Sequence, residues 1–520
     1  MIFNKFIFIS ALFFLSILPE TYSLSEIDSI KVHHETYYLG FTPLDSTYSI
    51  TKLTAAIDDV ISKNAKNLSG TKYGIGVYSL NQNKWYYKRN INQLLTPAST
   101  TKLFTTYTLL RQQGKGFNIA TEVFHDGKIQ PDGTLKGNIY IKGKGDALFS
   151  THDLEMLADN VRKAGITKIT GNILADGTFY DDKTERISYS GDRDVVQATP
   201  PITALNIDRN TATIIVKADS KAGAAPNIQV IPTSDSHVII NNAKVANVKG
   251  KKSGIRVSTT MLADGKQQFF VSGNIRPNST YTYQHLIHNP PLTIAGAFKN
   301  RLRAGGINVT GDIGVVKRTD SDSLQQKIQY ITDFKRPAND VINIVNKDSD
   351  NYLAEILYKM IGASAGAYND NALQTRHYMD SVFLCDGINF KDCLLNDGSG
   401  LSRRNLVTVE SLVIILANSA KMPFADDLFN SMSIASLDGT LRKRLKNTAA
   451  ENNMKAKTGT LRNVSALAGY IKTMDGEDLA FAFVFNGPNV GAYKLMENDL
   501  GKVLSEFFIE EVSLDKLDKK

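Results

Sequence analysis

Three short motifs in this 520-residue chain combine residue types that can carry out nucleophilic catalysis. Ser99 stands three positions before Lys102, an S-D-N motif occupies residues 349–351, and a K-T-G motif occupies residues 457–459. A serine hydroxyl is a weak nucleophile at neutral pH and needs a neighbouring base to take its proton. Because residues i and i+3 share one face of a helix, Lys102 can serve as that base.

None of these motifs identifies a site alone. The pattern S-x-x-K also occurs at Ser49, Ser69 and Ser513, and a K-S-G triplet begins at Lys252. What distinguishes the three motifs is their order along the chain together with the element that each one begins.

The elements expected around the motifs would place them at helix starts and on a strand. Thr96 is predicted to cap a helix that has Pro97 in its first turn and ends near Gly114. The S-D-N motif opens a predicted helix over residues 351–361, and the K-T-G motif lies on a predicted strand over 454–460.

The two ends of the chain share one pattern, and the middle has another. Strands are predicted over 75–80, 85–87, 466–473 and 479–487, and an amphipathic helix over 492–512 has Leu495, Leu500, Leu504, Phe507 and Phe508 facing inward. Between Lys102 and Ser349, glycine-bounded strands recur at 133–146, 165–177 and 306–316, two of them preceded by helices over 153–163 and 292–304. Residues 210–275 resemble a small β module. The pattern therefore predicts one α/β domain with a large insertion, and the insertion contains a repeated helix-turn-strand unit.

The bulk composition is that of a folded protein with a mild positive charge. Hydrophobic residues make up 42% and charged residues 22%, with a net charge of +8. This surplus suits an anionic polymer or surface, but it is spread along the chain and no basic stretch is interleaved with aromatic residues. We therefore expect no nucleic-acid partner and a surface that is mainly solvated.

The N-terminus resembles a secretory signal peptide. Lys5 precedes an apolar run over residues 6–18, and small polar residues follow up to Ser23. We expect residues 1–23 to be removed and the mature protein to be exported, in the periplasm. No later segment is long and apolar enough to span a bilayer, and the lysine-rich tail over 514–520 either contacts a lipid surface peripherally or is solvated.

The only two cysteines, Cys385 and Cys393, are eight positions apart. In an exported protein they either close a short loop as a disulfide or remain two free thiols. Their spacing matches no zinc-site pattern, and no metal or other cofactor is expected.

Together with TPASTTKL, GNIYIKGKGD, GNILADGTF, NDGSGLSRRN, SLDGTLRKR and KTGTLRNVSALAGY, the three motifs resemble the D-alanyl-D-alanine carboxypeptidase and endopeptidase family of low-molecular-mass, class C penicillin-binding proteins. The resemblance implies an α/β fold: a penicillin-recognising serine transpeptidase/β-lactamase-like domain, with an antiparallel sheet flanked by helices, interrupted by one α/β and one mainly β domain. The implied divisions are residues 50–118 and 335–515 for the peptidase domain, 119–209 and 276–334 for inserted domain II, and 210–275 for inserted domain III.

The resemblance also implies a role for each motif residue. Ser99 would attack the carbonyl of a D-Ala-D-X bond and Lys102 would accept its proton. Ser349 and Asn351 would line the second wall of the cleft, and Lys457 would bind the substrate carboxylate. The implied substrate-binding residues are Thr458, Gly459, Thr460, Arg403, Arg462 and Asp194, with Asp192 as the alternative to Asp194.

The implied partners are peptidoglycan stem peptides ending in D-Ala-D-Ala and β-lactam antibiotics, whereas the oligomeric state stays open. A β-lactamase or esterase on the same fold is one alternative function. Glu355, Glu410 and Glu451 lie between the last two motifs, but none has asparagine three residues later, as class A β-lactamases do. A non-catalytic cell-wall-binding scaffold is the other alternative.

Overall fold

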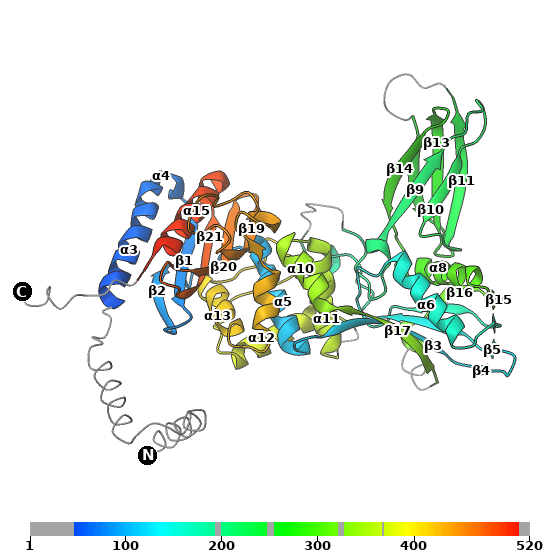
Figure 1. Cartoon of the computed structure of the whole chain (residues 1–520), viewed down its shortest axis with the longest axis horizontal. Coiled ribbons are helices and arrows are strands. Elements are labelled where there is room, and N and C mark those ends of the chain that lie inside the picture. The colour runs from blue at the N-terminus through cyan, green and yellow to red at the C-terminus, as the bar shows by residue number, and fades with distance from the viewer. Residues whose placement is uncertain (1–45, 193–198, 247–253, 321–326, 367–368, 509–520) are drawn as a thin grey trace, which may run out of the picture. The chain divides into compact units, whose positions relative to one another are not determined.

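The computed structural model describes residues 46–192, 199–246, 254–320, 327–366 and 369–508. The predicted signal peptide, Asp194 and the C-terminal tail lie outside these ranges. The described residues from Leu53 to Phe508 group into one unit by their internal contacts, and Figure 1 labels its helices and strands.

The first sheet combines strands from both ends of the chain. Its order is β18-β19-β20-β21-β1-β2, and all neighbouring strands are antiparallel. The strands are β1 (Lys72–Ser79), β2 (Lys84–Arg89), β18 (Ser433–Ile434), β19 (Lys455–Leu461), β20 (Val464–Lys472) and β21 (Asp478–Asn486). Because β18 is so short, most of β19 forms an edge of the sheet.

Helices cover the two faces of this sheet. Successive side chains of a strand point to opposite faces. Val484 of β21 belongs to the same core as Val413 of α13 (Val409–Ser419), whereas the neighbouring Phe485 stacks on Tyr493 of α15 (Val490–Glu506) with ring centroids 5.3 Å apart. α13 and α15 therefore pack on opposite faces. The described part of the chain thus has the predicted antiparallel sheet flanked by helices.

The helix that follows Ser99 is central to the helical layer on the α13 side. All residues of α5 (Thr101–Gln113) from Thr101 to Leu110 are buried. It packs against α10 (Ala338–Lys347), α11 (Asn351–Ser364) and α13. α12 (Asn371–Cys385) packs against α11, and its Phe383 ring also contacts Phe104 of α5.

The long insertion contains a second α/β arrangement. Its main sheet has the order β16-β8-β6-β3-β17, and a smaller sheet has the order β15-β7-β5-β4. Two helices, α6 (Thr151–Lys163) and α8 (Pro290–Ala304), pack against each other. The strands are β3 (Asn118–His125), β4 (Lys128–Ile129), β5 (Thr134–Lys136), β6 (Ile139–Gly143), β7 (Lys168–Ile169), β8 (Ile173–Asp176), β15 (Asn308–Val309), β16 (Ile313–Val315) and β17 (Gln329–Pro337).

The predicted repeat has a structural counterpart in the parallel strands β6, β8 and β16. Ile139 pairs with Ile173, which in turn pairs with Ile313. At the start of each strand, the Asn138 side chain accepts the Asn172 N–H at 2.8 Å, and the Asn172 side chain accepts the Asp312 N–H at 2.8 Å. The repeated glycine-polar-isoleucine pattern therefore places equivalent residues side by side.

A mainly β part follows within the insertion. It contains sheets of order β10-β9-β14 and β11-β13-β12. The strands are β9 (Thr211–Lys217), β10 (Asn227–Ile231), β11 (His237–Val245), β12 (Arg256–Met261), β13 (Gln267–Ile275) and β14 (Thr280–Leu286). Because β14 pairs with β9, the strand-rich segment extends beyond the predicted boundary at residue 275. We propose residues 211–286 as this domain, so that the second segment of inserted domain II becomes 287–334, and the predicted bounds of the peptidase domain are kept.

Three local predictions differ from the structure. Thr96 does not cap α5, because Ala98 adopts a φ of +49° and the chain enters α5 through the 3₁₀ turn η1 (Ala98–Thr100), which moves the N-cap position to Thr100. The other two are Leu495 and Phe508, which were predicted to face inward. Leu495 of α15 is 65% exposed, because the buried stripe of this helix runs through Tyr493, Met496, Leu500 and Leu504. Phe508, which lies just after the end of α15, is 48% exposed.

Cys385 and Cys393 are free thiols in the structure. Of the two alternatives for this pair, the structure therefore has the two separate thiols and not the disulfide.

Among the described helices, none combines the length and apolarity needed to cross a bilayer.

Candidate active site

Ser99 lies in η1, immediately before α5. The preceding Ala98 is buried and has a φ of +49°. Left-handed backbone is costly for a residue with a side chain and is concentrated at functional sites. Ser99 itself is half-buried, so its hydroxyl sits between the core and solvent.

Lys102 is fully buried one turn further along α5. Its Nζ lies 3.1 Å from Ser99 Oγ, 2.8 Å from Asn351 Oδ1 and 2.5 Å from the Ser399 carbonyl oxygen. A lysine ammonium has three donors, and here each has an acceptor. The side chain is therefore fixed with its nitrogen at the serine hydroxyl.

Burial lowers the pKa of Lys102 to about 8, although the nearby Asp397, Glu355 and Asp350 carboxylates oppose this shift. Desolvation disfavours the charged form of a lysine, which places its pKa closer to neutral pH. A lysine with this pKa can be neutral often enough to accept the proton of Ser99.

The S-D-N motif turns between α10 and α11. Ser349 has a φ of +60°, and the Asp350 carboxylate caps α11 by accepting the Leu353 N–H at 2.9 Å. The cap fixes Asn351 at the first position of the helix, from which its side chain reaches Lys102. The left-handed backbone of Ser349 and the helix cap at Asp350 together place the Ser349 and Asn351 side chains next to the two buried lysines.

The K-T-G motif lies on β19. Lys457 is fully buried and its Nζ lies 2.8 Å from Ser349 Oγ and 2.9 Å from the Thr458 carbonyl oxygen. Burial, reinforced by the charge of Lys102, holds the pKa of Lys457 well below its usual range. An arriving anion would favour the charged form of this lysine.

Gly459 brings β19 against the turn that carries Ser99. A Cβ at this position would lie 2.6 Å from the Pro97 carbonyl oxygen and 3.3 Å from the Ala98 Cβ. Thr460, the next residue, is exposed. Glycine at position 459 therefore sets the separation between β19 and the turn that carries Ser99.

The remaining predicted residues, outside the three motifs, are two arginines and an aspartate. Arg403 and Arg462 are both exposed, and Arg403 Nη1 lies 3.3 Å from the Arg462 carbonyl oxygen. The Arg403 N–H is bound by Asp192 Oδ2 at 2.8 Å. Asp194 lies outside the described residues, so of the two aspartates only Asp192 is placed beside Arg403.

A cavity of about 250 Å³ adjoins Asn351. Arg209 and Asp350, which are paired at 2.5 Å, line it together with Thr199 and Tyr352. Arg209 and Thr199 come from the insertion, so the space beside the S-D-N motif is bounded by both parts of the chain.

Sequence reasoning missed a set of polar residues behind Lys102: the buried Arg186, Glu355, Asp397 and Ser399 and the half-buried Tyr189. The sequence presents Glu355 only as an acidic candidate for β-lactam hydrolysis. Its position four residues after Asn351, hence on the same face of α11, is the signal that could have revealed it.

Within the ranges that the structure describes, no three His, Cys, Asp or Glu side chains are grouped to hold a metal ion. The arrangement of Ser99 with two buried lysines and two polar side chains is suited to covalent acyl transfer from a substrate that carries an anionic group.

Comparison with known proteins agrees with this chemistry. The family model of the D-Ala-D-Ala carboxypeptidase 3 (S13) family matches residues 53–505. A D-alanyl-D-alanine carboxypeptidase of Actinomadura sp. is 27% identical over 472 residues, which cover 88% of this chain and 85% of the relative. The D-alanyl-D-alanine carboxypeptidase DacB of Haemophilus influenzae is 26% identical over 425 residues, which cover 81% and 87%.

A solved structure also matches this chain in fold. The crystal structure of penicillin binding protein 4 (dacB) from Haemophilus influenzae matches with a TM-score of 0.65 and 25% identity, over 85% of this chain and 97% of that chain.

Proposed function

This chain belongs to the D-Ala-D-Ala carboxypeptidase 3 (S13) family and is a serine peptidase, and on that premise we propose that it hydrolyses D-Ala-D-Ala bonds through an acyl-enzyme on Ser99. The observation that carries the proposal is the contact of Lys102 Nζ with Ser99 Oγ at 3.1 Å, in a site where Lys102 is buried and fixed by two further acceptors.

In the first step, neutral Lys102 accepts the proton of Ser99 while Oγ attacks the carbonyl carbon of the penultimate D-alanine. The backbone N–H groups of Ser99 and Thr460 stabilise the oxyanion. The proton that Lys102 accepted then passes through Ser349, whose hydroxyl is in contact with Lys457, to the leaving amine as the C–N bond breaks. Water attacks the ester in the second step and regenerates Ser99.

Lys457 and Thr458 bind the terminal carboxylate of the substrate, and Asn351 binds a peptide amide. The carboxylate would supply the negative charge that the buried Lys457 lacks in the free site. Arg403, Arg462 and the aspartate at 194 or 192 contact the diamino acid of the stem peptide. β-Lactams, which mimic the same carboxyl-terminal unit, trap Ser99 as an ester; the Haemophilus influenzae relative has been solved with a β-lactam bound.

The natural substrate follows from the family: peptidoglycan stem peptides, with cross-links as a second substrate. Digestion of purified peptidoglycan followed by mass analysis is expected to show loss of terminal D-alanine from pentapeptides. Conversion of cross-linked dimers to monomers would establish endopeptidase action. Rapid hydrolysis of penicillin without loss of D-alanine would instead support the β-lactamase alternative, and absence of both reactions would support the scaffold.

The cellular location in this proposal is the periplasm, after removal of residues 1–23. The signal-like N-terminus and the extracytoplasmic position of peptidoglycan support it. N-terminal sequencing of protein from a periplasmic fraction should begin after about residue 23; a mature protein that still begins at Met1 would contradict it.

The acylation rate should rise with pH through about 8, because only neutral Lys102 can accept the Ser99 proton and burial lowers its pKa to about 8. The profile of kcat/KM against pH reports groups of the free enzyme, so its acidic limb should show this midpoint. Measurement of D-alanine release over the pH range in which the protein stays folded tests the assignment. A profile without an acidic limb in that range would exclude Lys102 as the base.

Replacing Gly459 with alanine should slow acylation by about 100-fold, since displacement of reacting groups by 1 Å can have an effect of that size. The added Cβ would meet the Pro97 carbonyl oxygen at 2.6 Å and push β19 away from Ser99. Stopped-flow acylation by a fluorescent penicillin measures the effect. Gly491→Ala, on α15 with no atom within 4 Å of the added Cβ, is the control and should react like the wild type. Equal rates for both variants would show that the separation set by Gly459 is not critical.

A further inference from the structure

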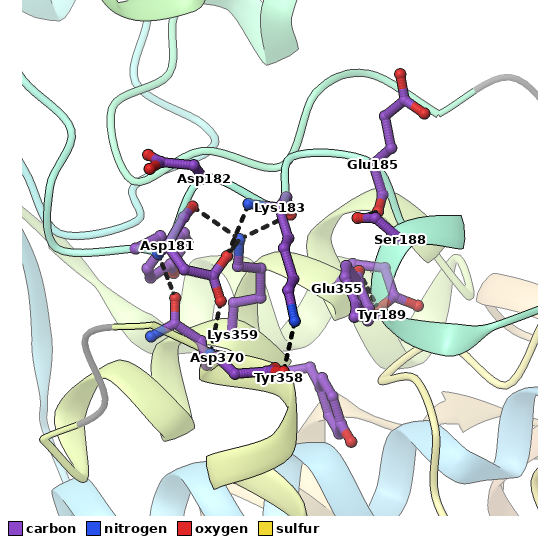
Figure 2. A network of polar contacts seen from close by, with 12 residues as sticks. Asp181, Asp182, Lys183, Glu185, Ser188, Tyr189, Glu355, Tyr358, Lys359 and Asp370 are labelled. Carbon is purple, nitrogen blue, oxygen red and sulfur yellow. Dashed lines mark hydrogen bonds and ion pairs between the residues drawn. The ribbon is translucent and has the colours of Figure 1, made fainter.

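One segment of the insertion, from Tyr180 to Asp192, reaches the helices behind the active site. Its first contacts are with α11: the Asp181 carboxylate lies 2.6 Å from the fully buried Lys359 Nζ, and Tyr180 OH donates to the Ile356 carbonyl oxygen at 2.8 Å. Figure 2 shows the Asp181–Lys359 pair together with the contact of Tyr189 with Glu355 further along the same segment. The segment is thus anchored on α11 before it approaches Lys102.

Two side chains further along this segment bind buried carboxylates. Arg186 Nη1 lies 2.9 Å from Asp397 Oδ2, and Tyr189 OH donates to Glu355 Oε2 at 2.9 Å. Both carboxylates are 0% exposed. Buried carboxylates are retained where partners satisfy them, and here each one has a partner that the insertion supplies.

The same carboxylates hold the backbone that receives Lys102. Glu355 accepts the N–H groups of Gly398 at 3.2 Å and of Ser399 at 3.0 Å, and Asp397 accepts that of Gly400 at 2.9 Å. The Ser399 carbonyl oxygen in turn accepts from Lys102 Nζ at 2.5 Å. A continuous set of hydrogen bonds therefore runs from Tyr189 through Glu355 and Ser399 to Lys102.

We propose that Tyr189 and Glu355 are positioning residues, which fix the Ser399 backbone against Lys102 and so make acylation of Ser99 depend on the inserted segment. The inference rests on the proposed function, because it concerns the base of that reaction. Neither residue touches Ser99, so the effect acts through the position and the protonation of Lys102.

The charges around Lys102 determine in which direction loss of Glu355 shifts the pKa of Lys102. Burial disfavours its ammonium, whereas the carboxylates of Asp397, Glu355 and Asp350 support it. Loss of the Glu355 charge should therefore leave Lys102 neutral at lower pH.

Glu355 itself faces Tyr189, Tyr358, Asp397 and Arg186. Burial raises its pKa to about 7, with the Asp397 charge adding to the shift. The Tyr189 hydroxyl donates to the ionised carboxylate and so favours its charged form. Removal of that donor should let Glu355 take up a proton more readily, which weakens its support of the Lys102 ammonium.

The test is the rate of Ser99 acylation by a fluorescent penicillin across pH in the full-length protein. In Tyr189→Phe the maximal rate is expected to fall about tenfold, as for loss of a hydrogen bond to a charged group, and the midpoint of the acidic limb should move to lower pH. Glu355→Gln should move this midpoint further in the same direction. Tyr180→Phe is the matched control: it removes a buried hydroxyl of the same segment that binds the same helix but no carboxylate, so its pH profile should match the wild type.

Thermal unfolding separates positioning from stability, because both tyrosine variants lose one buried hydrogen bond and should unfold at similarly reduced temperatures. A wild-type pH profile in Tyr189→Phe would overturn the inference alone, as would equal shifts in the two tyrosine variants. Absence of acylation in the wild type would overturn the proposed function and this inference with it. The two tyrosine variants suffice for the decision if Glu355→Gln does not fold.

Discussion

Replacement of Ser99 by alanine is expected to abolish covalent labelling by penicillin and to lower D-alanine release by at least about 10⁴-fold, as for loss of the nucleophile in other serine hydrolases. The reason is chemical, since no ester can form without Oγ. The half-buried position of Ser99 and its location in a 3₁₀ turn tolerate the smaller side chain, so the fold should persist. A fluorescent-penicillin gel with a thermal unfolding curve measures both expectations.

Ser69 provides the matched control, because it has the same S-x-x-K spacing to Lys72 but is exposed and lies outside the site. Ser69→Ala should label like the wild type. Labelling that survives Ser99→Ala, or that disappears only in Ser69→Ala, would assign the nucleophile to another residue. Unlabelled wild type would favour the scaffold alternative.

Local signals in the sequence predict the element at two of the three motifs, but they do not predict that the motifs meet. Asp350 has the residue type of a helix cap, and the strand that carries Lys457 precedes two apolar strands. The structure brings Ser349 within 2.8 Å of Lys457, although the two are 108 positions apart. Family resemblance supplied the expectation that these elements meet, since local propensity alone does not fix tertiary pairing.

The backbone conformation around Ser99 was not predictable from helix propensity. Thr96 followed by proline has the pattern of a helix start. In the structure, Asn486 binds the Thr96 N–H, Ala98 adopts a left-handed φ, and α5 begins only at Thr101. Tertiary constraints thus override a local preference at the point where Ser99 must be presented.

The contact of Tyr189 with Glu355 was hidden for a different reason. The two residues are 166 positions apart and lie on parts of the chain that the sequence assigned to separate domains. Polar residues at such distances have no periodic relation, so only the three-dimensional structure shows them as partners. The long insertion consequently contributes to the surroundings of Lys102 as well as to the space beside Asn351.

Replacement of Lys102 by methionine should reduce acylation by about 10³-fold or more, within the range that general base catalysis contributes. Methionine has a similar length and apolar character, so it can fill the fully buried space, but it cannot accept the proton of Ser99. It also leaves Asn351 Oδ1 and the Ser399 carbonyl oxygen without their donor, so some loss of stability is expected. Stopped-flow acylation, expressed per folded molecule from an unfolding curve, separates the two effects.

Lys299 offers a matched control, because it is a buried lysine of α8 that pairs with Asp235 at 3.3 Å, far along the chain from any of the three motifs. Lys299→Met should lower stability through the loss of this partner and leave acylation per folded molecule unchanged. The residual slow acylation of Lys102→Met should in addition lose the acidic limb near pH 8, since the group that titrates there is gone. Retention of that limb in the variant would show that another group takes the proton, and Lys457, whose Nζ is also held in the site, would then be the residue to replace next.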